Sequence, residues 1–301
     1  MYFYLYFWFA EQLGYFKDEG LQVEISDFAG GAKALQAMVG GSADVVSGAY
    51  EHTINMQAKG QAITAFVLQG RAPQIVMLAS NKTLPNYKSV ADLKGKKIGV
   101  TAPGSSTNMM ANFVLARAGL KPADVSFIGV GAAAGALSAM RSGQIDAMAN
   151  LDPVITMLEQ KNEVKVIADT RTLKDTNTIF GGMMPAATLY APEAFIKKNP
   201  NTTQALANAM VRALKWLQKA GPSDIVKVVP ESYLLGDRAL YLEAFLKVRE
   251  ALSPDGVMPE SGTRTMLKAL QTFEPDLVGK NIDLNRTYTN AFVIKANQKY
   301  K

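Results

Sequence analysis

The sequence has no cysteine and only one histidine among its 301 residues. The absence of cysteine excludes disulfides, thiolate zinc sites, iron–sulfur clusters and thiol nucleophiles. A single histidine removes most histidine-based metal sites and disfavours a histidine-dependent hydrolase. We therefore expect no metal site, no cofactor and no catalytic residue of these kinds.

Long apolar runs and basic runs are also missing. No window of about 18 apolar residues occurs, so the sequence predicts no membrane-spanning helix. Lysine and arginine form no run of five, and the net charge is +6 at pH 7, so nucleic acid is not expected as a partner. The length and the 48% hydrophobic share predict a globular chain of about two domains.

The first nine residues, Met1–Phe9, contain seven aromatic side chains. They lack the basic region and the small-residue cleavage site of a complete signal peptide, and they are too short to span a membrane. We expect them to form a buried strand or the start of a helix, because an exposed surface of this kind would aggregate. We also expect that an original leader segment is not present in this chain.

An internal repeat is the clearest structural signal. Residues 23–44 align with residues 125–146 at a constant offset of 102, and both contain A-L-x-A-M-x-x-G-x-x-D. Each copy predicts a strand, a Gly/Ala turn, a short helix ending at Gly41 or Gly143, and a second strand at 43–46 or 145–149. A single repeat at this spacing favours two similar α/β lobes, with a chance match as the alternative.

Strands and helices alternate through the rest of the first two thirds of the chain. Strands are predicted at 63–68, 75–79, 96–101, 164–168 and 187–190, and a helix from Asn108 to Ala118. Helices follow at 202–220, 237–251 and 261–273. The alternation predicts open, mostly parallel sheets in an α/β fold with a helical C-terminal stretch.

Three small-residue turns precede predicted helices. Gly104–Thr107 combines hydroxyl groups with the free N–H groups of a helix start, which bind oxyanions well; alternatively, Ser105 or Ser106 only caps its own helix. Gly30–Lys33 and Gly131–Gly135 occupy corresponding places in the repeat, where bare backbone admits a ligand. The glycine spacing of the latter departs from the dinucleotide pattern and does not favour nucleotide binding.

Several polar side chains are further candidates. Glu51 lies beside the only histidine, His52, which suggests either acid–base chemistry or a ligand contact. The nucleophile motif G-x-S-x-G is absent, so the ligand contact is favoured. Arg71 is a candidate anion clamp or a solvated loop charge. Met183 and Met184, beside two glycines, are candidates to line a cleft.

Residues 10–24, A-E-Q-L-G-Y-F-K-D-E-G-L-Q-V-E, carry a family resemblance. They resemble the opening A-x-x-x-G-Y-F-x-x-E-G-L-x-V-E of the nitrate/sulfonate/taurine-type solute-binding proteins of ABC importers, a group that includes the NMT1/THI5-like proteins. Further matches follow in the family's order, and together they extend over about residues 10–215: Phe28–Gly31 with Ala34–Leu35, Gly41–Asp44, Asp92–Gly99, Gly143–Asp146, and Pro192 through Pro200.

The resemblance implies a type II periplasmic-binding-protein fold, in which two α/β lobes close on a ligand cleft. It places lobe 1 at residues 1–72 plus 187–301 and lobe 2 at 73–186, with crossings near 71–74 and 184–187. The ligand contacts that it implies are Tyr4, Gly30, Gly31, Ala32, Tyr50, Glu51, His52, Arg71, Ser105, Ser106, Thr107, Ala133, Asp152 and Met183.

The function implied by the resemblance is a non-enzymatic solute receptor. It would be monomeric, periplasmic or lipid-anchored, and would deliver a small solute, such as a sulfonate, nitrate or taurine-like anion, to a membrane ABC permease. The alternatives are a pyrimidine-binding protein, a THI5-like enzyme that uses His52, and a sensor domain. The pyrimidine-synthase branch of the family carries cysteines where this chain has Gly181–Pro185, which disfavours that enzyme activity.

Overall fold

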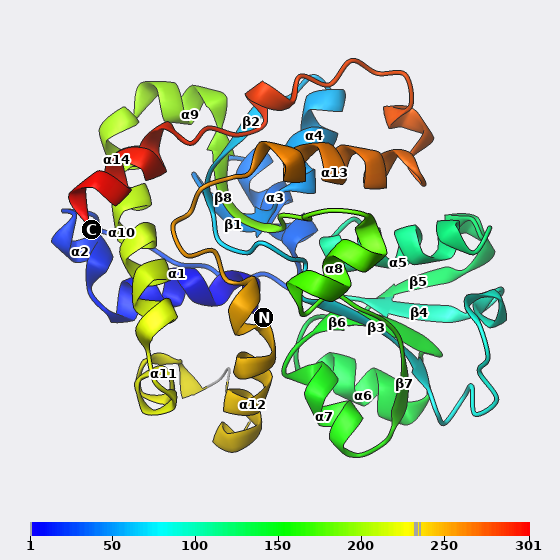
Figure 1. Cartoon of the computed structure of the whole chain (residues 1–301). Coiled ribbons are helices and arrows are strands. Elements are labelled where there is room, and N and C mark those ends of the chain that lie inside the picture. Colours follow the sequence, from blue (N-terminus) through cyan, green and yellow to red (C-terminus); the bar gives the residue numbers. More distant parts are fainter. Residues whose placement is uncertain (1, 232–233, 235) are drawn as a thin grey trace.

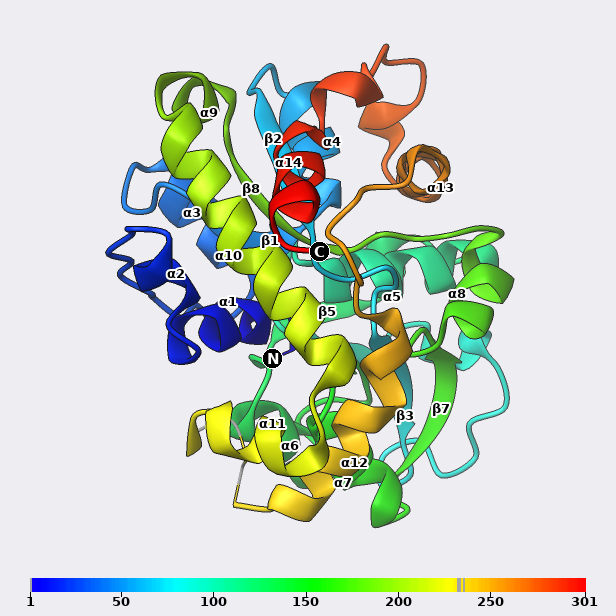
Figure 2. The ribbon, with the colours of Figure 1, turned by 60° about the vertical axis from the view of Figure 1, so that its left-hand side comes forward.

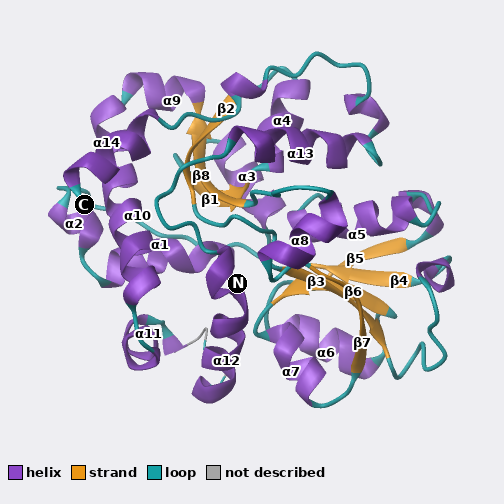
Figure 3. Ribbon diagram, in the orientation of Figure 1, coloured by secondary structure: helices purple, strands orange, loops and turns teal. Residues whose placement is uncertain are grey.

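This computed structural model describes residues 2–231, 234 and 236–301, with side chains from Tyr6 onward. Its strands form two separate sheets (Figure 1). The smaller sheet has the strand order β1-β8-β2 and the larger one β5-β4-β6-β3-β7 (Figure 3). Their bounds are β1 (Val46–Ala49), β2 (Ile63–Leu68), β3 (Ile75–Ser80), β4 (Lys97–Val100), β5 (Ser126–Gly129), β6 (Ala147–Leu151), β7 (Val164–Asp169) and β8 (Ala187–Pro192).

Helices cover both sheets and build most of the C-terminal third (Figure 1). They are α1 (Tyr2–Gln12), α2 (Tyr15–Asp18), α3 (Gly31–Val39), α4 (Glu51–Ala58), α5 (Ser106–Arg117), α6 (Ala134–Ser142), α7 (Val154–Gln160), α8 (Leu173–Phe180), α9 (Glu193–Lys198), α10 (Pro200–Lys219), α11 (Pro222–Val228), α12 (Arg238–Val248), α13 (Glu260–Gln271) and α14 (Ala291–Lys299). Among the described residues, none of the helices is both long and apolar enough to cross a membrane.

The α/β class is as predicted, but the expectation of mostly parallel sheets is wrong. β4 runs parallel to β5 and β6, whereas β3 is antiparallel to β6 and β7, and β8 is antiparallel to β1 and β2. β3 is the first strand after the chain passes to the larger sheet, and it lies between β6 and β7. β8 is the first strand after the chain returns to the smaller sheet, and it lies between β1 and β2. Alternation of strands and helices along a sequence does not reveal such insertions.

The two copies of the repeat differ in structure. The second copy forms β5, then α6, which ends at Gly143 with φ 83°, and then β6, two residues later than predicted. In the first copy α3 ends at Val39, and Gly41 follows its cap with φ 80°, as expected of a glycine just past a helix end. β1 begins at Val46 rather than Ala43. Residues 21–28 are extended but belong to no strand, so the strand predicted from Val23 is wrong. A strand requires a hydrogen-bonded neighbour, and none of the described strands is hydrogen-bonded to this segment in either sheet.

The aromatic opening forms α1, the second of the two structures expected for it. Tyr6 and Phe9 are almost fully buried, and the ring of Phe9 lies 5.6 Å from that of Trp216 on α10. Figure 2 shows α10 running along this side of the molecule with α1 and α14 beside it. Burial of large aromatic side chains against a long amphipathic helix contributes about 2–3 kcal/mol for each ring, which stabilises this arrangement.

The chain passes between the sheets at two places that lie side by side. The N–H groups of Gln69 and Gly70 both donate to the carbonyl of Ala187, and the N–H of Ala186 donates back to Gly70. A third segment joins them, because Ser253 donates to Gln69 and Arg71 to Ala251. The strands before residue 73 and after 186 fall in one sheet and those between in the other. The exact lobe boundaries remain a prediction.

The C-terminal helices do not all stay with the smaller sheet. α12 packs against α7 on the larger-sheet side (Figure 2). Gln160 donates to Glu243 at 2.7 Å, and Lys247 lies 3.7 Å from Glu159. This part of the chain therefore links the two halves of the molecule as the crossings do.

Candidate functional site

Three helix starts, from α3, α4 and α5, meet between the two sheets. The N–H of Ala32, in the first turn of α3, donates to Oγ of Ser105 at 3.1 Å. A Cβ placed on Gly30 would lie 2.9 Å from the same Oγ and 3.1 Å from Oγ1 of Thr101, so only a bare backbone fits at this contact. His52 at the start of α4 contacts the backbone of Gly104. The free N–H groups and the positive dipole ends of three helices thus point to one region.

Ser105 occupies the N-cap position of α5, but its side chain makes no cap hydrogen bond to that helix. Its hydroxyl instead accepts from Ala32 across the gap between the sheets. Thr107 is used differently: its Oγ1 accepts from the N–H of Thr101 at 3.0 Å and lies 2.8 Å from Oγ1 of Thr101. Ser105 therefore does not only cap its own helix, because its hydroxyl bonds to α3. Thr107 instead bonds to Thr101, directly after β4.

His52 is buried and neutral at physiological pH. Its Nδ1 lies 2.9 Å from the hydroxyl of Tyr190 on β8, and the two rings meet edge to face with centroids 6.0 Å apart. Burial lowers the pKa of His52 to about 4, while the contact with the backbone of Gly104 works in the opposite direction. The imidazole can therefore offer a polar contact without bringing a charge to the site.

Glu51 is also buried, and it too is neutral near pH 7. Burial raises the pKa of its carboxyl group to about 8, the backbone N–H of Glu51 opposes this shift, and the neighbouring carboxylate of Glu274 adds to it. Neither carboxyl oxygen has a hydrogen-bond partner among the described residues. A protonated Glu51 carries no charge, so it does not repel an anionic ligand at this helix start.

Two of the predicted contacts are engaged elsewhere. The hydroxyl of Tyr50 lies 2.5 Å from Oγ1 of Thr287, and the ring is completely buried in the smaller-sheet half. Arg71 lies at the first crossing, where its Nη2 donates to the carbonyl of Glu250 at 2.6 Å. The structure does not bring either side chain to the contact between Ala32 and Ser105. Arg71 instead fastens the crossing to the third segment.

Asp152 is bound by a cluster of charges that the sequence reasoning missed. Its Oδ1 accepts from the N–H of Thr156 at 2.9 Å, and its Oδ2 lies 3.5 Å from Nη1 of Arg171. The same guanidinium makes further ion pairs with Asp169 at 2.6 Å and Glu159 at 2.9 Å. Burial raises the pKa of Asp152 and Arg171 opposes the shift. The sequence contained one local signal of this cluster, an acidic and a basic residue two positions apart at a strand end, Asp169 and Arg171.

The other residues predicted to contact the ligand lie at helix starts or in a loop, except for one side chain that the structure does not describe. Gly31, Ala32 and Ser106 lie at the helix starts just described, and Ala133 is the N-cap residue of α6. Met183 is half-buried in the loop after α8, where a Cβ on the neighbouring Gly182 would lie 2.7 Å from Oγ1 of Thr265 on α13. The side chain of Tyr4 lies outside the described residues. Which of these residues contact a ligand remains a prediction.

The chemistry of this region is that of polar, uncharged binding. The described residues include no group of three or more His, Asp or Glu side chains placed to hold a metal ion. Helix N–H groups, the hydroxyls of Ser105 and Ser106, and the neutral imidazole of His52 are hydrogen-bonding groups that can replace the water of a small polar solute.

Two sheets joined by adjacent crossings, with helix starts facing one another between them, define the periplasmic-binding-protein fold. The comparisons show this fold. The alkanesulfonate-binding protein SsuA from Xanthomonas axonopodis pv. citri, solved with MOPS bound, superposes with a TM-score of 0.71 at 20% identity, over 94% of this chain and 93% of that one. The periplasmic nitrate-binding protein NrtA from Synechocystis PCC 6803 gives 0.74 at 13% identity, over 98% and 86%.

The chain belongs to the NMT1/THI5-like family, whose model matches residues 4–222. The resemblance found in the sequence is thereby confirmed. A solved structure from Bordetella bronchiseptica RB50 is 63% identical to this chain and superposes with a TM-score of 0.97, over 99% of this chain and 94% of that one.

Proposed function

We propose that this protein is the solute-binding receptor of an ABC importer and that it takes a small anion of the sulfonate or nitrate kind. In this proposal the two lobes close on the solute, and the closed form docks on a membrane permease outside the cytoplasm. The family membership and the names of the structural neighbours support this reading. The receptor works as a monomer and carries out no reaction on the solute.

The single observation that carries the proposal is the hydrogen bond from the N–H of Ala32 to Oγ of Ser105. A helix-start N–H is a strong donor for oxyanions, and here it is directed at a hydroxyl of the opposite half of the molecule. An oxygen of a bound anion can accept from this N–H and from the Ser105 hydroxyl together. The solute would then bridge the two lobes and favour the closed form by its differential affinity.

The enzyme alternative is weaker. Acid–base chemistry by Glu51 and His52 needs the two side chains to exchange a proton with each other or with a substrate. The hydrogen-bond partner of His52 is Tyr190, and Glu51 faces the negative charge of Glu274. The pyrimidine alternative loses support because the named neighbours bind sulfonate and nitrate.

The test is thermal unfolding against a panel of alkanesulfonates, taurine, nitrate, bicarbonate, aromatic carboxylates and thiamine-type pyrimidines. A ligand at 100 times its Kd raises the free energy of unfolding by about 2.7 kcal/mol, which is a rise of several degrees in Tm for a chain of this size. We expect stabilisation by one class of anion and recovery of that anion chemically unchanged. Stabilisation by pyrimidines alone, or turnover of the ligand, would contradict the proposal.

A further inference from the structure

His52, the only histidine of the chain, lies between the two halves of the molecule. Its Nδ1 is 2.9 Å from the hydroxyl oxygen of Tyr190 on β8, in the smaller sheet, and its ring contacts the backbone of Gly104 on the opposite side. The residue is 2% exposed, and Nε2 is buried without a hydrogen bond to any described residue. Folded proteins rarely leave a buried polar atom unsatisfied, so Nε2 is a candidate contact for a solute.

Tyr190 is held in place by its sheet. It is fully buried, and it pairs with Val46 in the register of β8 and β1. A Cβ on Gly48 of β1 would lie 2.8 Å from the Tyr190 hydroxyl oxygen, so only glycine leaves room for the hydroxyl at this position. The sheet therefore fixes the point from which Tyr190 reaches His52.

The hydroxyl of Tyr190 decides which nitrogen of His52 carries the proton. Burial lowers the pKa of His52 to about 4, so the imidazole is neutral at pH 7 and has one N–H and one bare nitrogen. The hydrogen bond at one nitrogen sets the role of the other. A phenol is a stronger donor than acceptor, and a bare imidazole nitrogen accepts well, so the pair is most stable with Tyr190 donating to Nδ1. Nε2 then carries the proton.

The contact with Gly104 favours the same tautomer. The N–H of Gly104 donates to Oδ1 of Asn108 at 2.9 Å, which leaves the carbonyl of Gly104 to face the imidazole. This contact acts to raise the pKa of His52, as an acceptor near a ring N–H does. Nε2–H is therefore directed towards the opposite half of the molecule.

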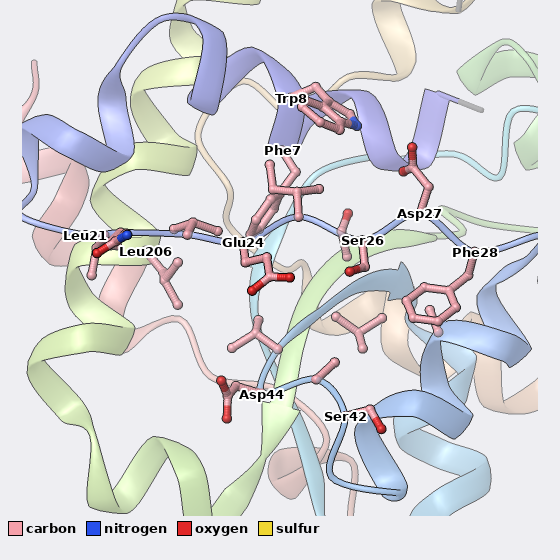
Figure 4. A pocket seen from close by; sticks show the side chains of 18 of the residues that line it. Phe7, Trp8, Leu21, Glu24, Ser26, Asp27, Phe28, Ser42, Asp44 and Leu206 are labelled. Carbon is pink, nitrogen blue, oxygen red and sulfur yellow. The ribbon is translucent and has the colours of Figure 1, made fainter. Parts of the chain in front are cut away.

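A separate cavity beside β1 offers a different chemistry. Figure 4 shows this cavity, which has a volume of about 420 Å³, and the charged residues of its described lining are all acidic: Glu24, Asp27 and Asp44. Carboxylates repel an anion, and the lining includes neither His52 nor Ser105. The groups that suit an oxyanion are therefore the donors between the two sheets.

We propose that Tyr190 is a positioning residue of the solute site, which fixes the tautomer of His52 so that Nε2–H donates to an oxygen of the bound anion. The inference rests on the proposed function, because it describes one donor of the same site. Together with the N–H of Ala32 and the hydroxyl of Ser105, this donor lets both halves of the molecule bind the solute.

The tautomer also determines which solutes are excluded. The opposite tautomer would direct the lone pair of a bare nitrogen at the solute, and this lone pair would repel an anionic oxygen. With the proton on Nε2, the site instead rejects a solute that presents an N–H group at this place, as an ammonium ion does, because two donors would face each other. His52 is thus a specificity-determining residue that acts without a charge.

Nitrogen NMR of the ¹⁵N-labelled full chain tests the tautomer directly, since a single histidine gives one pair of imidazole nitrogen signals. At pH 7 we expect the pattern of the Nε2–H tautomer in the solute-free protein. Saturation with methanesulfonate or nitrate should shift the Nε2 signal more than the Nδ1 signal. Tyr190→Phe removes the donor to Nδ1 and is expected to give a mixture of the two tautomers.

Solute affinity is the second readout. Tyr190→Phe is expected to weaken binding of the same two anions about three- to tenfold, with a change of only a few degrees in Tm. Tyr87→Phe is the matched control, because Tyr87 lies in the loop after β3, at the end of that strand away from the first crossing. It should keep the tautomer and the affinity of the parent protein.

Two substitutions of His52 separate its two nitrogens. The side-chain amide of glutamine reaches as far as Nε2, whereas that of asparagine reaches only as far as Nδ1. We expect His52→Gln to bind the anions about three- to tenfold more tightly than His52→Asn, because only glutamine keeps a donor towards the solute. A merely structural imidazole would give the two variants equal affinities.

Three outcomes would overturn the proposal. The first is the Nδ1–H tautomer in the parent protein, and the second is an unchanged tautomer and affinity in Tyr190→Phe. The third is an affinity of His52→Asn equal to that of His52→Gln. Each of them leaves the proposed receptor function standing, because the solute panel tests that function separately. Absence of stabilisation by every anion of the panel would contradict the proposed function, whatever the tautomer.

Discussion

The amide nitrogen of Ala32 and the hydroxyl oxygen of Ser105 form a 3.1 Å hydrogen bond although 73 residues separate them. The two residues belong to helix starts on opposite sides of the molecule, α3 beside the smaller sheet and α5 beside the larger one. A bond that connects the two halves in this way depends on their closed arrangement. Substitutions at this contact therefore separate effects on closure and solute binding from effects on folding.

Removing the Ser105 hydroxyl is expected to weaken solute binding with little loss of stability. Ser105→Ala removes the hydroxyl that accepts from Ala32 and that can donate to the solute. The loss of the bond to the solute is expected to reduce the binding free energy by about 1–1.5 kcal/mol, or to raise Kd about tenfold. Titration calorimetry with the anion identified by the panel measures the change. Ser138→Ala, at an exposed position on α6, is the matched control and should bind as the parent protein does. Equal affinity in all three proteins would show that Ser105 does not contact the solute.

A methyl group at Gly30 is expected to hold the helix starts apart. Gly30 has an extended backbone with φ −174°, which alanine adopts without strain, but its Cβ would lie 2.9 Å from Oγ of Ser105. We expect Gly30→Ala to reduce solute affinity at least about tenfold while Tm changes by only a few degrees. Small-angle scattering should show the variant more open than the parent. Gly221→Ala, where the nearest atom is 3.4 Å away, is the control, and the same affinity loss in that variant would contradict the steric explanation.

The buried Glu51 carboxyl predicts that stability falls as the pH rises from 4.5 to about 8. Burial raises its pKa from 4.5 to about 8, so the folded protein keeps a proton that the unfolded chain has released across this range. The contribution is fully present below pH 4.5 and is lost as pH rises through 8. The slope is at most about 1.4 kcal/mol per pH unit. Urea unfolding between pH 5 and 9 measures it.

Glu51→Gln keeps the shape of the side chain and removes its titration. We expect the variant to show a flatter stability profile above pH 5, whereas Glu24→Gln, the same change at an exposed residue, keeps the parent profile. His52 acts on the acid side, because its lowered pKa makes stability fall as pH drops from 6.5 towards 4. A slope between pH 4.5 and 8 that is unchanged in Glu51→Gln would assign the proton to another group.

Arg171 is expected to be a structural residue with a large effect on stability. Its side chain is 8% exposed and that of its partner Asp152 is fully buried, so Arg171→Met leaves a buried carboxylate unpaired at a cost of about 3–5 kcal/mol. Denaturant midpoints measure the loss. The double variant with Asp152→Asn should recover part of it, since asparagine can still accept from Thr156 and carries no charge. A single variant as stable as the parent would show that the cluster contributes no net stability.

The sequence determined much of the local structure and the family. The strand predicted at 63–68 forms at those residues as β2, and the second copy of the repeat ends its helix at Gly143 as its glycine pattern requires. The helix start after Gly104 was also foreseen, as was the α/β class. These features depend on residues close in the chain, whose backbone preferences and spacing of apolar side chains are visible without knowledge of the fold.

The tertiary structure decided which distant groups meet. The strand pattern of residues 21–28 is present in the sequence, but the segment belongs to neither sheet, because a strand also needs a hydrogen-bonded strand beside it. A serine at a helix start has the same local signal whether it caps its helix or, as Ser105 does, accepts from a helix of the other half. The neutral state of Glu51 and the attachment of Asp152 to Arg171 likewise follow from burial and from contacts made only after folding, because desolvation and charge pairing depend on three-dimensional neighbours.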